Sequence, residues 1–591
     1  YLNHTGFGHL MPKYYIFFAY LIFCRKMHSF VLKYTGIRSY SPMLCLSEFK
    51  EKSMKKLVAL FMVLVVASTA VVFSGCTKST EDLMENAKVN LPKDKYNTYY
   101  QIWIGSFCDS NNDGIGDIQG IISKLDYIND GDDSTDTDLG YTGIWLSPMM
   151  PSPSYHKYDV KDYYNIDPQF GTLDDFDQLI KECDKRGIDV IIDFVPNHCS
   201  SEHPWFKKAL KEAEKGNFNG YAKYFNIKKS SETESGYNCD PDDSSIIYES
   251  NFTDTMPEWN YDYEGTKKEM AKAAKFWIDR GVAGFRLDAV RYLYYNDYEK
   301  SSEALKWFYD TCKKEKNDIY MVGEDWSSDM NEVTAMYKSG IDSLFAFPFG
   351  DTSGKFLASV ISGSINDYTD TLLSYEKKTK EANKNTINAY FLTNHDMSRV
   401  GDSLTELYQK KMAAALYMTT PGNAFTYYGE ELGMETYDEG DDPAKRTAMI
   451  WDSDNLPNVT ANGIDRVEDN TDGGGVKQQD KNKDSLLNFY KKLIKLRNCH
   501  PGIARGTISA LPDDFDGGSG VGGYYLTYKN EKYLVLHNLD TDKHNFEITD
   551  KLIDDDYKIA GMFSAKSGKV SIEKNVLTLP AYSTIVLHST K

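Results

Sequence analysis

Eight short and almost continuously apolar segments alternate with amphipathic stretches between residues 99 and 428. Apolar runs that do not alternate with polar residues are typical of strands buried on both faces, in parallel sheets covered by helices. Eight β-then-α units predict an α/β fold, a (β/α)8 TIM barrel, whose chemistry lies at the carboxyl ends of the strands. The predicted strands are Tyr99–Ile104, Gly143–Leu146, Val190–Phe194, Gly284–Leu287, Tyr320–Val322, Ser343–Phe345, Tyr390–Thr393 and Ala424–Tyr428.

Two regions interrupt or follow the predicted barrel, which we place at residues 96–498. Roughly 60 residues, 199–262, separate the third strand from the next helix, whereas ordinary connections of this kind have about 2–6 residues. We therefore predict an inserted subdomain there. After the predicted helix Ser485–Arg497, alternating segments such as Tyr524–Tyr528 and Ser583–Leu587 predict a C-terminal antiparallel β-sandwich domain at residues 499–591.

The net charge of the chain limits the kinds of molecule that it can bind. The chain has 67 Lys and Arg against 87 Asp and Glu, a net charge of −20. Such a field repels phosphate backbones, so we expect no nucleic-acid partner. The 43 Tyr and 8 Trp suit either a packed core or the flat faces of sugars. Nine Cys are too few for a disulfide framework, and the sequence leaves the pairing of individual cysteines open.

Residues 54–76 have the features of a secretion signal. Lys55 and Lys56 precede an apolar stretch, Leu57–Phe73, which is somewhat short of the about 20 residues that span a bilayer. The ending Phe73–Cys76 resembles a bacterial lipobox, whose cysteine receives a diacylglycerol group. This resemblance implies a signal peptide at 54–75, lipidation of Cys76 and an extracellular protein anchored to the bacterial cell membrane by its lipid; a retained membrane anchor is the alternative.

The residues on either side of this signal follow from it. Residues 76–95 are polar and would form a tether between the membrane and the first fold. Residues 1–53 stand upstream of a signal peptide, and we expect them to be a non-native extension ahead of a true start at Met54.

Polar clusters follow several of the predicted strands. A single acid after a strand is usually a helix cap, but several acids, two histidines and an arginine at one barrel mouth indicate an active site. The clusters are Asp193–His198 after strand three, Arg286–Ala289 at strand four, Glu324–Trp326 after strand five and Asn394–Asp396 after strand seven.

These clusters resemble the four conserved sequence regions of the α-amylase family, glycoside hydrolase family 13. The similarity extends from about Tyr96 to the C-terminus and includes Met256–Asn260 and Tyr427–Gly433. The stretch Asn129–Leu139 is similar to an insertion in bacterial lipoprotein α-amylases. Arg291 and Tyr292 depart from the Lys-His that many α-amylases carry, which leaves the leaving-group preference open.

The resemblance implies roles for individual residues. Asp288 would be the nucleophile, Glu324 the general acid and base, and Asp396 the carboxylate that stabilises the transition state. Retaining glycosidases hold their two catalytic carboxyl groups about 5–5.5 Å apart. The substrate-binding residues implied in the same way are Tyr158, Asp159, His198, Arg286, His395 and Arg446. Asp159 would pair with Arg446, for which a structural salt bridge is an equal explanation.

A loop after the first strand carries oxygen ligands at regular spacing. Its residues Asp109, Asn111, Asp113, Ile115 (by its carbonyl) and Asp117 repeat the opening of an EF-hand loop, with Gly at the sixth position. A solvated acidic turn is the alternative. The family resemblance implies a structural Ca2+ here, away from the cleavage point. Asn197 corresponds to a ligand of a second calcium in many α-amylases, a site that the sequence leaves open.

The expected protein is therefore a retaining, endo-acting α-amylase that cleaves α-1,4 bonds of starch and maltooligosaccharides as a monomer. Its alternatives are an exo-acting α-glucosidase, a neopullulanase-like enzyme or a glucanotransferase. From another class, a non-catalytic glycan-binding lipoprotein is the remaining alternative, although Asp288, Glu324 and Asp396 are all present.

Overall fold

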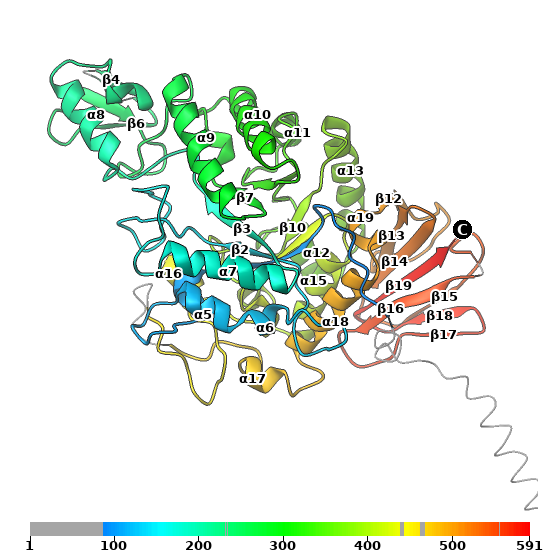
Figure 1. Ribbon diagram of the computed structural model, residues 1–591. Coiled ribbons are helices and arrows are strands. Elements are labelled where there is room, and N and C mark those ends of the chain that lie inside the picture. Colours follow the sequence, from blue (N-terminus) through cyan, green and yellow to red (C-terminus); the bar gives the residue numbers. More distant parts are fainter. Residues whose placement is uncertain are drawn as a thin grey trace, which may run out of the picture. The chain divides into compact units, whose positions relative to one another are not determined.

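The predicted strands pair in parallel to form a nearly closed barrel (Figure 1). The computed structural model describes residues 87–590, except 231, 233, 438–441, 461–466 and 555. The upstream extension, the signal peptide, Cys76 and the first half of the tether lie outside these residues. Within the described part, no helix combines the length and the apolar character needed to cross a lipid bilayer.

The barrel sheet has the order β10-β11-β1-β2-β3-β7-β8-β9. One parallel bridge between Phe345 and Ala389 joins its two end strands. The TIM-barrel prediction is confirmed, and each strand starts within one residue of its predicted position. The strands are β1 Thr98–Ile102, β2 Gly143–Leu146, β3 Asp189–Phe194, β7 Gly284–Leu287, β8 Tyr320–Gly323, β9 Ser343–Leu344, β10 Ala389–Phe391 and β11 Asn423–Tyr427.

Aromatic rings fill the interior of the barrel. The ring of Tyr99 stacks on those of Tyr320 and Phe425, with centroids 5.4 and 4.6 Å apart. Glycine is needed where backbones approach closely, because a Cβ at Gly284 would lie 1.9 Å from the carbonyl oxygen of Tyr320. The barrel is thus a packed core, and any site must lie at one of its ends.

Helices cover the outside of the barrel, and α7 (Leu173–Lys185) shows why they form where they do (Figure 1). Thr172 accepts a hydrogen bond from the Asp175 amide, and Asp175 accepts one from the Thr172 amide, which makes a capping box. Phe176, Leu179, Ile180 and Cys183 form the buried stripe. Gly187, with φ +69°, lets the chain leave the helix in a left-handed conformation.

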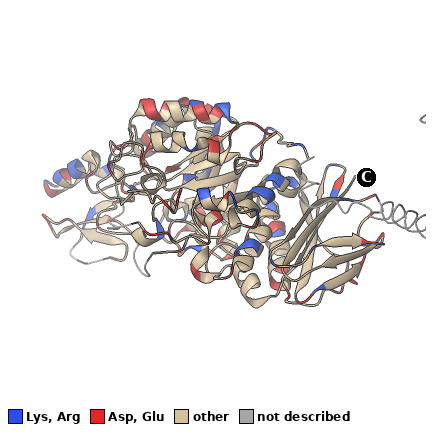
Figure 2. Ribbon diagram, turned by 90° about the horizontal axis from the view of Figure 1, so that it is seen from below, with Lys and Arg blue, Asp and Glu red and all other residues tan. Residues whose placement is uncertain are grey.

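The remaining elements of the barrel region are short connections and covering helices. Lysine, arginine, aspartate and glutamate gather on the helices, and the strands carry few of them (Figure 2). These remaining elements are α4 Ile104–Phe107, α5 Ile118–Ser123, α6 Leu125–Ile128, α9 Glu264–Asp279, η2 Val290–Tyr292, α10 Tyr298–Glu315, α11 Met330–Tyr337, α12 Lys355–Ser362, α13 Asn366–Ala382, α14 Val400–Ser403, α15 Leu407–Met418, η3 Glu430–Leu432, α16 Asp442–Lys445, α17 Val476–Gln479, α18 Leu486–Cys499 and α19 Gly502–Arg505.

The segment between β3 and α9 carries its own secondary structure. It contains α8 (Pro204–Glu214), η1 (Tyr221–Tyr224) and an antiparallel sheet of β4 (Ile227–Lys229), β6 (Ile246–Glu249) and β5 (Tyr237–Cys239). Phe206 of α8 packs edge-on against Tyr248 of β6 at 4.9 Å, so the helix and the sheet share a small core.

Two antiparallel sheets form the C-terminal region (Figure 1). Tyr525, Leu534, Leu577 and Ile585 belong to the core between them. The first sheet has the order β12-β13-β14-β19-β16 and the second β15-β18-β17. Their strands are β12 Thr507–Ala510, β13 Val521–Tyr528, β14 Glu531–Asn538, β15 His544–Glu547, β16 Lys558–Ser564, β17 Ser571–Glu573, β18 Val576–Leu579 and β19 Ser583–Thr590.

Candidate active site

Arg286 lies at the centre of a cluster of carboxylates from three neighbouring strands. It belongs to β7 and is only 1% exposed. Its Nη1 donates to Asp288 Oδ1 at 2.7 Å and to Asp193 Oδ1 at 2.9 Å, and its Nη2 lies 2.9 Å from Glu324 Oε1. The strands β3, β7 and β8 are adjacent, so the acids at their ends converge. The predicted nucleophile and the predicted acid therefore share one planar cation.

Asp193 is a part of this cluster that the sequence did not single out as a site residue. Its Oδ2 accepts hydrogen bonds from Trp145 Nε1 at 3.2 Å and from the Tyr158 hydroxyl at 3.1 Å. Burial raises the pKa of Asp193 to about 7, and the Arg286 guanidinium opposes that rise. The available signal was its position at the end of strand three, where it begins the motif that ends with His198.

The two carboxyl groups that share Arg286 lie in different environments. Burial raises the pKa of Glu324 to about 8; the carboxylates of Asp288 and Asp396 add to the rise, and Arg286 opposes it. Burial also raises the pKa of Asp288, but a direct hydrogen bond from Arg286 favours its ionised form. This difference suits Glu324 to hold a proton at neutral pH and Asp288 to be a carboxylate.

The backbone after Asp288 positions the acid. Ala289 has φ +50°, a left-handed conformation that is uncommon for a residue with a side chain. Its amide donates to Glu324 Oε2 at 3.2 Å. Glu324 is thus held at one oxygen by Arg286 and at the other by a backbone N–H, so its carboxyl group has a defined orientation.

Asp396 lies beside a second buried arginine. Arg446 Nη2 is 2.8 Å from Asp396 Oδ1, and Arg446 Nε donates to the carbonyl of His395 at 2.9 Å. The sequence suggested Asp159 as the partner of Arg446, whereas the structure places this guanidinium against Asp396. Asp159 accepts hydrogen bonds from the hydroxyls of Ser152 and Ser154. Both serines donate to the same oxygen, Oδ1, a local arrangement that the sequence spacing could not reveal.

Tyr158 and His395 form a flat pair of rings at the mouth. Their rings are 7° from parallel with centroids 5.6 Å apart, and the Tyr158 hydroxyl lies 2.6 Å from His395 Nε2. Gln101 Nε2 lies 2.7 Å from His395 Nδ1. Burial holds the pKa of His395 well below its usual range, so the imidazole is neutral. Both nitrogens of this ring are therefore engaged, and His395 holds the Tyr158 hydroxyl in place.

His198 belongs to the same region through the chain after β3. It is 2% exposed, and burial lowers its pKa to about 4. Its Nε2 has no hydrogen-bond partner, and neither does Oδ1 of the neighbouring Asn197. The ring of Phe252 lies 5.2 Å from that of His198. Buried ring nitrogens normally have a hydrogen-bond partner, so the unpartnered Nε2 of His198 is a candidate contact for a ligand.

The loop with metal-ligand spacing forms a tight turn. Asp109 accepts hydrogen bonds from the amides of Asn111, Asn112 and Gly114, and Gly114 has φ +88°. Asp113 accepts from the Ile115 amide at 2.8 Å. The carboxylate of Asp117 faces Ser110 and caps α5 through the Gly120 amide. Carboxylate, amide and carbonyl oxygens suit a hard cation, and the donor set fits Ca2+ chemically.

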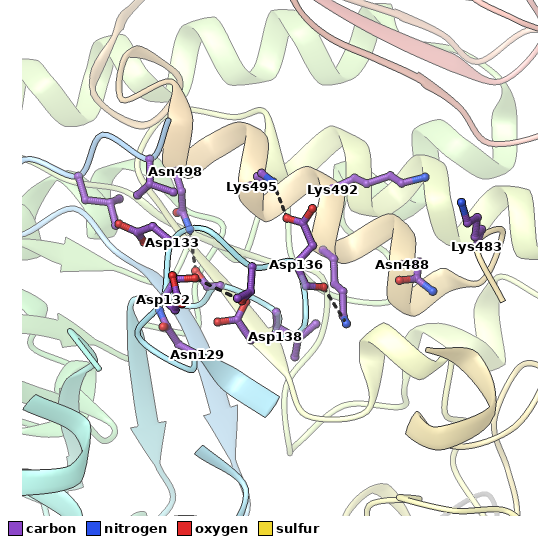
Figure 3. Close-up of a pocket in the computed structure, with 16 residues that line it drawn as sticks. Asn129, Asp132, Asp133, Asp136, Asp138, Lys483, Asn488, Lys492, Lys495 and Asn498 are labelled. Atoms are coloured by element: carbon purple, nitrogen blue, oxygen red, sulfur yellow. Dashed lines mark hydrogen bonds and ion pairs between the residues drawn. The ribbon is translucent and has the colours of Figure 1, made fainter. Parts of the chain in front are cut away.

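A cavity of about 240 Å³ lies apart from these residues (Figure 3). It is lined by the segment after α6, which includes Asp132 and Asp136, and by lysines near or on α18. Lys495 pairs with Asp136, and Lys491 donates to the carbonyl of Thr137 at 2.9 Å. The predicted catalytic residues do not line it. These contacts fasten the segment to α18.

Comparison with known families places most of the chain. Residues 101–506 match the model described as "Alpha amylase, catalytic domain". Residues 521–586 match the model of the "Alpha-amylase SusG C-terminal domain".

The chain covers nearly the whole length of individual relatives. The chain is 34% identical to Alpha-amylase 3 of Dictyoglomus thermophilum over 504 residues, 84% of this chain and 94% of that protein. It is 28% identical to an oligo-1,6-glucosidase of Bacillus cereus, covering 78% of this chain and 93% of that protein. The solved structure of Eubacterium rectale Amy13B is 38% identical with a TM-score of 0.80, covering 87% of this chain and 99% of that one.

Proposed function

Because the chain belongs to the α-amylase family of glycoside hydrolases, we propose that it is a retaining, endo-acting α-amylase. Its substrates would be starch and maltooligosaccharides, cleaved at internal α-1,4 bonds. The observation that carries the proposal is the pair of carboxyl groups, Asp288 and Glu324, held on one Arg286 guanidinium. Two carboxyl groups on one barrel mouth, one ionised and one protonated, are what retaining glycoside hydrolysis requires.

In the first step, an ionised Asp288 oxygen attacks the anomeric carbon of the sugar. Glu324 donates its proton to the glycosidic oxygen as the bond to that oxygen breaks. The chain beyond the cleavage point leaves with a new hydroxyl, and a β-linked ester to Asp288 remains. Arg286 contacts both Asp288 and Glu324, so the two carboxyl groups would keep their positions during this step.

In the second step, the Glu324 carboxylate removes a proton from water. As this proton moves to Glu324, the water oxygen attacks the anomeric carbon and the ester bond to Asp288 breaks. Glu324 is then protonated again and Asp288 is again a carboxylate. Two inversions leave the product in the α configuration of the substrate. A sugar hydroxyl in place of water would give transglycosylation, which is the glucanotransferase alternative.

The surrounding residues would bind the sugar at the cleavage point. Tyr158 offers a flat ring, and His198 offers its unpartnered Nε2 to a hydroxyl group. His395, a predicted binding residue, would act through Tyr158, whose hydroxyl it contacts. Asp396, oriented by Arg446, would bind hydroxyls more strongly as positive charge develops on the sugar. Asp159 is held by the hydroxyls of Ser152 and Ser154.

Exposed aromatic rings support action on long chains. Trp326, two residues after the acid, is 41% exposed and stacks on Phe347 with centroids 5.0 Å apart. Phe252 is 46% exposed and packs against His198 and Tyr292. Flat rings beside the mouth suit further glucose units of a polymer. The relatives named oligo-1,6-glucosidase keep the exo-acting and α-1,6-specific alternatives open.

The proposed enzyme would carry a structural Ca2+ and a lipid anchor. Asp109, Asn111, Asp113, the Ile115 carbonyl and Asp117 would hold the ion and fix the loop after β1. Lipidation of Cys76 would anchor the enzyme outside the cell. Polysaccharides are too large to be imported intact, so they would be cleaved there. We propose that it works there as a monomer.

Product profiling tests the proposed activity. Soluble starch, maltotriose, pullulan and isomaltose are each incubated with the enzyme, and the anomeric configuration of fresh ends is followed by NMR. A spread of α-configured maltooligosaccharides from starch is expected. Glucose as the sole early product would favour the exo-acting alternative, cleavage of isomaltose the α-1,6-specific one, and β-configured ends would refute retention.

A further inference from the structure

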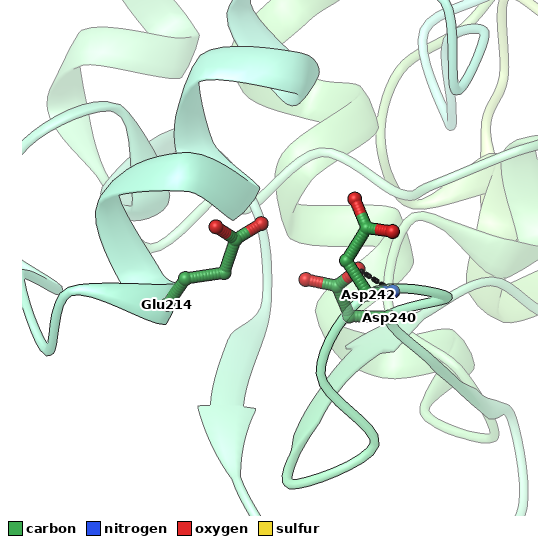
Figure 4. Close-up of side chains that lie close together, drawn as sticks. All are labelled: Glu214, Asp240 and Asp242. Atoms are coloured by element: carbon green, nitrogen blue, oxygen red, sulfur yellow. Dashed lines mark hydrogen bonds between the residues drawn. The ribbon is translucent and has the colours of Figure 1, made fainter.

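Three carboxylates from two separate parts of the inserted segment come together (Figure 4). Glu214 is the last residue of α8, and Asp240 and Asp242 follow directly after β5. One oxygen from each residue lies within 4.8 Å of the other two. Close packing of three acids raises their mutual repulsion and favours an opposite charge among them.

Asp240 supplies a second and independent observation. It is 3% exposed, and its Oδ1 accepts a hydrogen bond from the Asp242 amide at 2.9 Å. Its other oxygen, Oδ2, is buried and has no hydrogen-bond partner. Figure 4 shows that oxygen turned toward Glu214. A buried carboxylate oxygen without a donor is costly, and a bound cation would remove that cost.

We propose that Glu214, Asp240 and Asp242 bind a divalent cation, Ca2+, at a site distinct from the loop after β1. Oxygens that share one Ca2+ at 2.3–2.6 Å can lie up to about 5 Å apart, whereas those around Mg2+ at 2.0–2.1 Å span only about 4 Å. The three oxygens lie within 4.8 Å of one another, inside the span of one Ca2+, and three protein carboxylates are more than the one or two that Mg2+ usually takes. Two of the ligands are exposed, so water completes the coordination sphere.

The ion would act as a cross-link within the insert. It would join the end of α8 to the turn that leads from β5 into β6, two parts that otherwise meet through packing such as Phe206 on Tyr248. Its role is therefore structural: it fixes the insert without contact with the catalytic carboxylates. The inference does not depend on which glycosidic bond the enzyme cleaves.

Counting bound ions tests the proposal. The full chain is dialysed against Ca2+, and its bound calcium per chain is measured by elemental analysis and by calorimetric titration. The double variant Glu214→Gln with Asp242→Asn should bind one calcium fewer than the wild type. Both residues are exposed, so neither substitution disturbs a core. Glu232→Gln with Asp254→Asn, which changes two exposed acids of the same insert, is the charge-matched control and should keep the wild-type count.

Two further measurements keep the outcome clear. Asp109→Asn with Asp113→Asn empties the other loop, so combining both pairs of substitutions should remove calcium additively if the sites are separate. Titration with Mg2+ should show much weaker binding than Ca2+ at the Glu214 site. An unchanged calcium count in the Glu214→Gln, Asp242→Asn variant, with normal circular dichroism, would overturn the proposal.

Discussion

Glu324→Gln should abolish turnover and at the same time stabilise the fold at neutral and alkaline pH. Gln keeps the shape of the side chain and can accept the Ala289 hydrogen bond, but it neither donates an acidic proton nor titrates. General acid and base catalysis contributes about 10²- to 10⁴-fold, so turnover on starch should fall by at least that range. Starch binding should persist, because the sugar-binding groups are intact.

The gain in stability follows from the environment of Glu324. Burial raises its pKa from an ordinary value near 4.5 to about 8. A folded-state pKa above the unfolded value contributes stability that is present below about pH 4.5 and is lost as pH rises through 8. At about 1.36 kcal/mol per pKa unit, the full loss is on the order of 5 kcal/mol. The Gln side chain does not ionise, so the variant does not lose this stability.

The assay is the thermal midpoint of wild type and variant between pH 5 and pH 9 at one scan rate. Their midpoints should be close at pH 5, and the variant should become progressively more stable up to pH 8. Glu303→Gln, an exposed residue of α10, is the control and should show a constant difference and normal turnover. A midpoint difference that does not change with pH, or near-normal turnover of Glu324→Gln, would refute the assignment of the acid.

The other predictions concern the pH profile, the metal, the aromatic surface and the anchor. The alkaline limb of kcat/KM should fall near pH 8, where the raised pKa of Glu324 is passed and the acid loses its proton; a rate that stays constant to pH 10 would contradict this. Chelation should lower the thermal midpoint of the wild type, and Asp113→Asn should reduce that response; equal midpoints with and without chelator would argue against bound calcium. Trp326→Ala should raise KM several-fold for starch while changing it little for maltotriose, and equal effects on both would indicate a role in folding instead. Cys76→Ala should release the protein from membranes, and continued retention would favour an uncleaved anchor.

Much of the barrel could be predicted from the sequence because its strands are buried on both faces. The apolar run Gly143–Leu146 matches its strand at both ends, and so does Gly284–Leu287, which is apolar except for Arg286. The helix after Thr172 was predictable because its cap, its apolar stripe and its terminating glycine are all local signals. The sheet of the insert was not predicted, since β4 and β5 have only three residues each and lie in a polar segment.

The site was predictable in its residues but less so in its contacts. Asp288, Glu324 and Arg286 follow or belong to adjacent strands, so topology alone brings them together. The contact of Arg446 with Asp396 joins residues 50 positions apart through loops, whose paths no local pattern fixes. Long-range pairs of this kind depend on the whole fold, and a single sequence does not reveal them.

The junction between β9 and β10, the two end strands of the barrel sheet, differs from the other strand pairs. Between β9 and β10 the main chains share one bridge and two hydrogen bonds, from the Ile387 amide to the Asp342 carbonyl and from the Ala346 amide to the Ala389 carbonyl, each 2.8 Å long. Side chains add to this short contact: Ser343 donates to the carbonyl of Ile387, and Tyr337 of α11 donates to Asn388. Elsewhere the ring is held by main-chain atoms that every residue possesses. Here few main-chain bonds close the ring, and the hydroxyl groups of Ser343 and Tyr337 supplement them. A substitution that removes one of these hydroxyls therefore weakens the closure of the barrel, whereas the longer strand pairs do not depend on their side chains in this way.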